Sequence, residues 1–222
     1  MSFTPLPTIF TDLSGSGSGS LRGSPDSDNS RNLELGCGDG RFQAEAARCG
    51  VKLWGLDLSP PAMGTTADIV GDACFPPITP GSLDLLVAPN LVRHLLAVSG
   101  GLEFLDLWLT LLKPGGSLFI FEDEPTNDTA ATVNYRDLQD FLRQLVPESR
   151  GGLLPLAEFL ELSAQAQPGL HWEHGMARNL QPIDSSPVLA LLGPGPLKHS
   201  IAGEGLDPGR YWWAQASAGR KG

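Results

Sequence analysis

The stretch LELGCGDGRF, from Leu33 to Phe42, places three glycines within five residues directly after a short apolar run. Glycine weakens strands and helices, so such a cluster suits a backbone that turns sharply or lets a ligand come close. The residues before it predict a buried strand, and RFQAEAARCG predicts a helix that ends at Gly50. This strand, glycine turn and helix together are typical of a ligand site in an α/β sheet.

Apolar strands and helices continue to alternate as far as Glu124. Further strands are predicted at VKLWGLDLS, ADIVGDA, SLDLLVAPN and GSLFIFEDE. Between the last two, the segment LVRHLLAVSGGLEFLDLWLTLLKPGG is expected to contain a strongly apolar helix, stopped by Pro114 and Gly115. Strands of this kind, separated by helices, imply a parallel sheet covered on both faces.

The character of the chain changes after Glu124. We expect two amphipathic helices, NYRDLQDFLRQLV and LPLAEFLELSAQA, and two more strands, LHWEHGMARN and RYWWAQASA. Segment 180–208 between those strands is rich in Pro and Gly. It is therefore expected to be a long loop, with room for one helical turn at SPVLALL.

Charge and composition exclude several classes of protein. The chain has 222 residues with 15 basic and 25 acidic side chains, a net charge of −10. This charge repels a phosphate backbone and no basic cluster offsets it, so a neutral or cationic small molecule, or a protein side chain, fits better than nucleic acid. No apolar run reaches membrane-spanning length. Cys37, Cys49 and Cys74 lie far apart without metal-type pairing, so we expect no metal site and a reducing, cytoplasmic setting.

Residues 1–30 are predicted to be a flexible N-terminal segment. Its part TDLSGSGSGSLRGSPDSDNS, residues 11–30, is a linker of Gly, Ser and Asp with almost nothing to bury. Whether the piece FTPLPTIF ahead of this linker docks onto the domain is left open. Residues 31–222 are predicted to form a single domain.

Two acidic residues follow the strands after the glycine turn. Asp57 ends the second strand in GLDLS, where a carboxylate can accept hydrogen bonds from both hydroxyls of a ribose. Asp72 ends the third in GDA, where it could reach an adenine amine. The glycine spacing is G-x-G-x-G rather than the G-x-G-x-x-G of nicotinamide-binding folds. It favours a compact ligand with an amino-acid tail, and it disfavours a nicotinamide dehydrogenase.

The sequence resembles the class I S-adenosylmethionine-dependent methyltransferases, most closely those that act on small molecules. The matching segments, in the family's order, are LELGCGDGRF, GLDLS, GDACFPP, GSLDLLVAPNLVRHL and LLKPGGSLFIFE. The resemblance implies an α/β fold, a three-layer sandwich with a seven-stranded, mostly parallel Rossmann-like sheet whose last strand is antiparallel. It also implies S-adenosyl-L-methionine as cofactor, S-adenosyl-L-homocysteine as product, and a catalytic domain over residues 31–222.

The same resemblance implies a set of cofactor-binding residues: Glu34, Gly36, Cys37, Gly38, Gly40, Asp57, Leu58, Asp72, Ala73 and Asn90. The glycine turn and the acid before it would hold the methionine part, and Asp57 the ribose. Leu58 would pack beside the adenine, with Asp72 and Ala73 on either side of it. Asn90 would lie under the sulfonium.

The chain departs from the family's pattern in two places. Between Asp57 and Asp72 the family usually carries a full helix, but here two prolines can open only one turn and Gly64 disfavours continuing it. We therefore predict a shortened crossover and a more exposed adenine edge. The helix that many relatives carry before the first strand is replaced by linker. Segment 180–208, or a partner chain in a homodimer, would then have to cover the substrate.

Methyl transfer from a sulfonium needs little more than alignment and exclusion of water. A general base is needed only where the nucleophile carries a proton at a high pKa. The catalytic candidates are His94, as a base or a substrate hydrogen bond, and Glu122, which with Glu124 could hold a cationic amine. The alternatives are a packed helix residue and a solvated strand end. His171 and His174 are interpreted as strand residues rather than zinc ligands.

The predicted function is transfer of a methyl group from S-adenosylmethionine to a small-molecule acceptor. An aminopropyl transferase with the same glycine turn is one alternative, and only residues 122–124 hint at the acidic amine channel it would need. A non-catalytic protein that binds the cofactor or stabilises a partner is another, since the adenine side is shortened. The sequence leaves open the acceptor atom and whether a homodimer completes the site.

Overall fold

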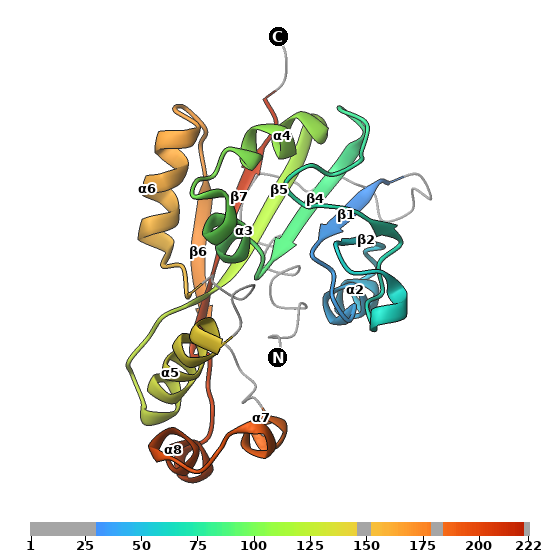
Figure 1. Cartoon of the computed structure of the whole chain (residues 1–222). Coiled ribbons are helices and arrows are strands. Elements are labelled where there is room, and N and C mark those ends of the chain that lie inside the picture. Colours follow the sequence, from blue (N-terminus) through green and yellow to red (C-terminus); the bar gives the residue numbers. More distant parts are fainter. Residues whose placement is uncertain (1–29, 146–151, 179–183, 220–222) are drawn as a thin grey trace. The chain divides into compact units, whose positions relative to one another are not determined.

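The computed structural model of the chain describes residues 30–145, 152–178 and 184–219 (Figure 1). Almost all of the predicted N-terminal segment, with the piece FTPLPTIF, lies outside the described residues. The described chain divides into two units. We call residues 30–89, 103–120 and 215–219 the N-terminal unit, and residues 90–102, 121–145, 152–178 and 184–214 the C-terminal unit.

The described strands form one seven-stranded sheet in the order β3-β2-β1-β4-β5-β7-β6. They are β1 (Asn32–Leu35), β2 (Trp54–Asp57), β3 (Ile69–Val70), β4 (Leu83–Pro89), β5 (Leu112–Glu124), β6 (Glu173–Arg178) and β7 (Arg210–Ser217). β1 pairs in parallel with β2 and with β4, and β2 pairs in parallel with β3. The sheet is mostly parallel and β7, the last strand of the chain, is antiparallel. This confirms the predicted fold class and each predicted strand.

Helices connect most of the strands of the described chain, whereas β3 and β4 are joined by residues 71–82 without a helix (Figure 1). They are α2 (Arg41–Arg48), the short 3-10 helix η1 (Pro61–Met63), α3 (Val92–Ser99), α4 (Phe104–Leu111), α5 (Ala130–Leu145), α6 (Leu156–Ala166), α7 (Ser186–Leu191) and α8 (Pro196–Glu204). The shortened crossover after β2 is confirmed, since η1 is a single turn that ends at Gly64 with a φ of 88°. Only glycine adopts this left-handed backbone at little cost.

Two predictions about helices are confirmed only in part. The strongly apolar helix expected between β4 and β5 is α4, but the separate helix α3 precedes it, because Gly100 ends α3 with a φ of 76°. The helical turn expected at SPVLALL is α7, but segment 180–208 is not otherwise a loop, because its described part also contains α8. Each of these helices has a proline in its first turn, Pro187 or Pro196, where the missing N–H costs nothing.

Each unit has its own packed interior. In the N-terminal unit Trp108 of α4 is fully buried, packs against the tilted ring of Phe104, and donates its indole N–H to the carbonyl of Ala73 at 2.8 Å. In the C-terminal unit Phe159 of α6 packs between the rings of Trp172 and Trp212, with centroids 5.1 and 4.8 Å away. These aromatic side chains bury a large apolar area where α4 and α6 pack.

The C-terminal unit also contains a separate helical cluster. α5, α7 and α8 lie together at one end of this unit (Figure 1). Their shared interior consists of Tyr135 and Leu138 of α5 with Ile201 and Leu206 from α8 and the residues after it. The stretch predicted to be a loop is therefore ordered because its leucines pack against α5.

Candidate functional site

The glycine turn after β1 has the backbone that its sequence predicts. Gly36, Gly38 and Gly40 have φ values of 68°, 50° and 74°, all in the left-handed region that favours glycine. The amide of Gly36 donates to the carbonyl of Leu56 on β2 at 2.7 Å, and the amide of Thr66 donates to the carbonyl of Gly38 at 2.8 Å. The turn is thus fastened to the neighbouring strand and to the crossover that follows η1.

Asp57 also fastens this turn. Its Oδ2 accepts a hydrogen bond from the amide of Gly38 at 3.0 Å, and its Oδ1 accepts one from the amide of Ser59 at 2.8 Å. The carboxylate at the end of β2 therefore faces the glycine turn. Each carboxylate oxygen has a further lone pair, so Asp57 retains capacity to accept hydrogen bonds from a ligand.

Glu34 is a buried acid at the end of β1. Its side chain is 1% exposed, and Oε2 has no hydrogen-bond partner among the described residues. Burial, and then the negative charges of Asp39 and Asp57, raise the pKa of Glu34 from its ordinary 4.5 to about 8. A buried carboxyl with an unused oxygen gains most from a cationic partner, because the cation removes the penalty on its charged form.

The turn opens to free space on one side. A Cβ added at Gly38 would meet no atom within 4 Å.

Cys37 is buried, and burial together with the charges of Glu34 and Asp57 raises the pKa of its thiol to about 11. At neutral pH Cys37 is therefore a protonated thiol and a poor nucleophile, which leaves it a packing role in the turn.

Apolar side chains stand exposed beyond β2 and β3. Leu58, Met63 and Phe75 are 73%, 75% and 75% exposed. Asp72 accepts a hydrogen bond from the amide of Cys74 at 2.8 Å, and Ala73 is buried against Trp108. The sequence prediction included Leu58 but missed Met63 and Phe75. Phe75, directly before two prolines in GDACFPP, is the one that the sequence pattern could have singled out.

Asn90, in the C-terminal unit, holds a strained turn directly after β4. Its φ is 51°, and it is the one non-glycine residue with positive φ in the described chain. Its amide donates to the carbonyl of Phe121 at 2.7 Å, and its Oδ1 accepts from the amide of Asp123 at 3.3 Å. Two bonds to β5 therefore hold a conformation that asparagine tolerates better than most residues.

A buried charge cluster lies next to Asn90 in the sequence and in the same unit. The guanidinium of Arg93 is 2% exposed, with Nε 3.6 Å from Oε2 of Glu122 and Nη1 3.5 Å from Oδ2 of Asp123. The hydroxyl of Tyr135 donates to the same Oδ2 at 2.6 Å. Burial opposes the charge of Arg93, but Glu122 and Asp123 outweigh it and raise its pKa. The guanidinium is therefore a permanent cation at the centre of this cluster.

Two acidic side chains at the end of β5 accept hydrogen bonds from backbone amides in the first turns of helices. Oε1 of Glu122 accepts from the amide of Arg93 at 3.1 Å, at the start of α3, and Oε2 of Glu124 accepts from the amide of Leu156 at 3.0 Å, at the start of α6. Neither helix has a side-chain cap of its own. The solvated strand end weighed for residues 122–124 is wrong, because Glu122 is 1% exposed. A buried carboxylate engaged in this way is also not the exposed group expected of a substrate amine contact.

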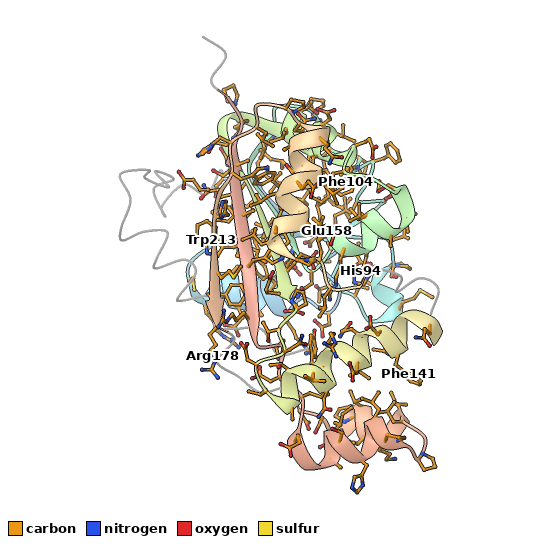
Figure 2. The ribbon with its side chains drawn as sticks, turned by 90° about the vertical axis from the view of Figure 1, so that its left-hand side faces the viewer. His94, Phe104, Phe141, Glu158, Arg178 and Trp213 are labelled. Carbon is orange, nitrogen blue, oxygen red and sulfur yellow. The ribbon has the colours of Figure 1, made fainter. Side chains whose placement is uncertain are left out.

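His94 follows Arg93 on α3 and is labelled in Figure 2. Its Nε2 accepts a hydrogen bond from Nε of Arg93 at 3.4 Å. Burial, and then the charge of Arg93, lower the pKa of His94 from 6.5 to about 4. At neutral pH His94 is therefore an uncharged imidazole, which makes it a weak general base.

The predicted site residues divide between the two units. Glu34, Cys37, Asp57 and the glycines of the turn are joined by contacts within the N-terminal unit, which also contains Leu58, Asp72 and Ala73. Asn90, His94 and Glu122 belong to the C-terminal unit. The cofactor candidates other than Asn90 therefore belong to one unit, and Asn90 and the catalytic candidates belong to the other. The sequence prediction missed Arg93, Asp123 and Tyr135.

The described residues contain no cluster of three or more His, Cys, Asp or Glu side chains that could hold a metal ion. In the same part of the chain, no helix has the length and apolar character needed to cross a membrane.

Comparison with known proteins points to one family. Residues 33–120 match a family model described as a methyltransferase domain. No curated protein sequence matches the chain significantly. Among solved structures, the chain is similar to a methyltransferase described as putative from Bacillus halodurans C-125, with 15% identity, a TM-score of 0.53, and coverage of 96% of this chain and 98% of that one.

Two further structures share the fold. A SAM-dependent methyltransferase from Archaeoglobus fulgidus is similar with 14% identity and a TM-score of 0.56, over 96% of this chain and 90% of that one. The phosphoethanolamine N-methyltransferase 2 of Haemonchus contortus, in complex with phosphomonomethylethanolamine and S-adenosylhomocysteine, is similar with 19% identity and a TM-score of 0.51, over 87% of this chain and 49% of that one.

Proposed function

We propose that this chain, which belongs to the class I S-adenosylmethionine-dependent methyltransferases, transfers the methyl group of S-adenosyl-L-methionine to a small-molecule acceptor. The observation that carries the proposal is the buried carboxyl of Glu34 beside a glycine turn that opens to free space. The ligand must be small enough to approach the backbone at Gly38 and must carry a positive charge for Glu34. The aminoacyl tail of S-adenosylmethionine meets both conditions.

The contacts within the N-terminal unit suggest which residues hold the cofactor. Gly36, Gly38 and Gly40 would admit the aminoacyl tail to the backbone of the turn, with Cys37 packed beneath them. Glu34 would ionise against the ammonium group. Asp57, already bonded to the turn, would use its remaining lone pairs for the ribose hydroxyls.

The exposed apolar side chains suggest where the adenine lies. Leu58 and Phe75 are three-quarters exposed without a ligand, and an adenine ring packed on them would remove that apolar surface from water. Asp72 and Ala73 would flank the ring. Asn90 would approach the sulfonium, as the family resemblance implies.

Charge favours a small acceptor over nucleic acid. The chain carries a net charge of −10 from 25 acidic and 15 basic residues. A nucleic-acid substrate would need a basic surface to offset its phosphates. The structurally similar enzyme from Haemonchus contortus, whose complex contains phosphomonomethylethanolamine, is a precedent on this fold for a small polar acceptor.

Titration calorimetry followed by an acceptor screen tests the proposal. We expect the chain to bind S-adenosylhomocysteine with a stoichiometry of about one, and to release it from S-adenosylmethionine when an acceptor from a panel of small acids, amines and thiols is present. Binding without turnover on any acceptor would favour a non-catalytic cofactor-binding protein. Turnover only with decarboxylated S-adenosylmethionine would instead favour aminopropyl transfer.

Replacing Gly38 with valine is expected to abolish cofactor binding. The side chain would fill the open space beside the turn and would strain a backbone whose φ is 50°. Gly50→Val is the matched control, because Gly50 also has positive φ and open surroundings but follows α2. The measurement is calorimetry with S-adenosylhomocysteine on both variants. Equal affinities would remove the glycine turn from the site.

Replacing Asp57 with alanine is expected to weaken cofactor binding by about 1.5–3 kcal/mol, the usual loss for hydrogen bonds to a charged group. Asp39→Ala is the control, since Asp39 is an acid of the same turn whose carboxylate bonds Arg41 instead. Calorimetry with adenosine as well as S-adenosylhomocysteine should show the loss for both ligands. An unchanged affinity for adenosine would contradict a ribose contact.

A further inference from the structure

Arg93 and His94 are neighbours on α3, and the side chain of Arg93 donates a hydrogen bond to that of His94. Nε of Arg93 is 3.4 Å from Nε2 of His94. The guanidinium has no lone pair to offer, so in this contact the histidine nitrogen must be the acceptor. A neutral imidazole that accepts at Nε2 carries its single proton on Nδ1.

The orientation of Arg93 is fixed from two other elements. On β5, Glu122 and Asp123 lie 3.6 and 3.5 Å from its Nε and Nη1. On α5, Tyr135 bonds Asp123 at 2.6 Å, and burial together with Asp123 raises the pKa of this phenol, so it remains a neutral donor. Groups on three elements therefore hold a buried cation at Nε2 of the histidine.

Glu122 and Arg93 differ in how their charge depends on pH near neutrality. Burial raises the pKa of Glu122 to about 7, although Arg93 partly offsets that effect, so its carboxyl can gain or lose a proton near neutral pH. Arg93 stays charged throughout, because its acidic neighbours raise its pKa. His94 consequently faces a constant positive charge whatever the state of Glu122.

We propose that Arg93 is a positioning residue that keeps His94 a neutral imidazole with its proton on Nδ1. Two features of the contact act in the same direction. The cationic donor at Nε2 disfavours an imidazolium, and its hydrogen bond selects one of the two neutral tautomers. The burial of His94 adds to this effect but would not by itself choose a tautomer.

A consequence for the acceptor follows, and it rests on the proposed methyltransferase function with His94 in contact with the acceptor. A histidine in this state offers an N–H from Nδ1 and does not remove a proton from a weakly acidic nucleophile. It suits an acceptor whose nucleophilic atom is already deprotonated at neutral pH, such as a carboxylate or an acidic thiol. Among the small molecules of the acceptor panel, we therefore expect activity on anionic oxygen or sulfur acceptors, and not on the neutral or cationic molecules that the net charge of the chain favours.

Long-range proton–nitrogen NMR of the full chain, labelled with 15N-histidine, tests the role of Arg93 without any ligand. The chain has four histidines, and the signals absent from His94→Gln identify those of His94. We expect the Nδ1–H pattern in the native chain at pH 7, and no titration of His94 between pH 5.5 and pH 8. An Nε2–H pattern, or a titration midpoint near 6.5, would overturn the proposal.

The informative variant removes the cation together with one of its two carboxylates. Arg93→Met combined with Glu122→Gln deletes one positive and one negative charge, and Gln retains an oxygen for the amide at the start of α3. We expect the His94 titration midpoint to rise by about 1 unit or more, and the tautomer preference to weaken. Arg136→Met, which removes a cation paired with Asp137 at the surface of α5 and keeps the guanidinium of Arg93, is the control and should leave the His94 signals unchanged. An unmoved midpoint in the double variant would refute the role of Arg93.

Activity then separates this proposal from the proposed function. His94→Asn places an amide N–H near the position of Nδ1, whereas His94→Gln places it near Nε2. We expect the Asn variant to retain about tenfold more kcat/KM than the Gln variant on the best acceptor. Equal losses in the two variants would refute donation from Nδ1. Absence of any methyl transfer with the NMR result intact would refute the proposed function while leaving the role of Arg93 standing.

Discussion

Replacing Arg93 with methionine is expected to lower the free energy of unfolding by about 3–5 kcal/mol, the usual loss when one partner of a buried ion pair is removed. Arg93 is 2% exposed, and its loss leaves Glu122 and Asp123 in the interior without their counter-ion. Urea denaturation followed by circular dichroism at pH 7.5 measures the change. A loss below 1 kcal/mol would mean that water, and not Arg93, stabilises these carboxylates.

Two variants complete this experiment. Arg93→Met with Glu122→Gln should recover a good part of the loss, because the charge removed on α3 is matched by one removed on β5. Arg136→Met is the surface control, since Arg136 pairs with Asp137 on the exposed side of α5. Its effect should stay within about 0.5 kcal/mol.

Replacing Glu34 with glutamine is expected to make the chain more stable at pH 8 and less able to bind the cofactor. The folded chain raises the pKa of Glu34 from 4.5 to about 8, mainly by burial. Between these values the folded chain keeps a proton that the unfolded chain releases, so its stability falls as pH rises, by about 1.4 kcal/mol per pH unit. Glutamine carries no charge and should remove this dependence.

The difference in unfolding free energy between the two proteins isolates Glu34 from other titrating groups. We expect this difference to grow by about 2–3 kcal/mol from pH 5.5 to pH 7.5, in favour of the glutamine variant. Glu158→Gln, on the exposed side of α6, is the matched control and should give no such trend (Figure 2). A difference that does not change with pH would show that Glu34 is ionised in the folded chain.

The same variant tests the cofactor contact. If the cofactor's ammonium ionises Glu34, binding releases a proton and the native affinity should rise with pH up to about 8. The glutamine variant should bind more weakly and lose this rise. Calorimetry in two buffers with different ionisation enthalpies measures the released proton directly. A native affinity that is flat across this range would contradict the contact.

The sequence predicts the fold well where local signals agree. The glycine turn at Gly36–Gly40, the apolar strands and the prolines at 60 and 61 each point to one local structure, and all of these are confirmed. The turn is predictable because its three left-handed residues are all glycine. The positions of Glu34 and Asp57 follow from the same pattern, since each closes a strand that borders the turn.

The charge cluster could not be predicted in this way. A run of consecutive acidic residues is usually exposed to solvent, so the sequence favoured a solvated strand end for residues 122–124. The residues next to Arg93 in the sequence do not indicate that its side chain is buried. The acids at 122 and 123 lie about 30 positions further along the chain, and Tyr135 lies about 42 positions further. Only the tertiary fold brings these groups together. Burial of the cluster is a property of the packing of α3 and α5 against β5, which no window of sequence contains.

The break between α3 and α4, and the helix α8, were not predicted, and the two omissions have opposite causes. In the first, apolar residues run on across Gly100 and Gly101, so hydrophobicity suggested continuity where two glycines interrupt the helix. In the second, the many Pro and Gly residues of segment 180–208 suggested irregular structure, although Pro187 and Pro196 stand in the first turns of α7 and α8. In both cases the prediction followed the composition of the segment and not the position of each Gly or Pro within a helix.

The contact between Glu122 and the start of α3 bears on how the protein folds. An eight-residue helix without its own cap has little independent stability, and here the group that binds its first turn lies 29 residues away. A peptide spanning this helix should therefore be a random coil by itself. In native-state hydrogen exchange its amides should open together with those of the C-terminal half of β5, as one cooperative unit.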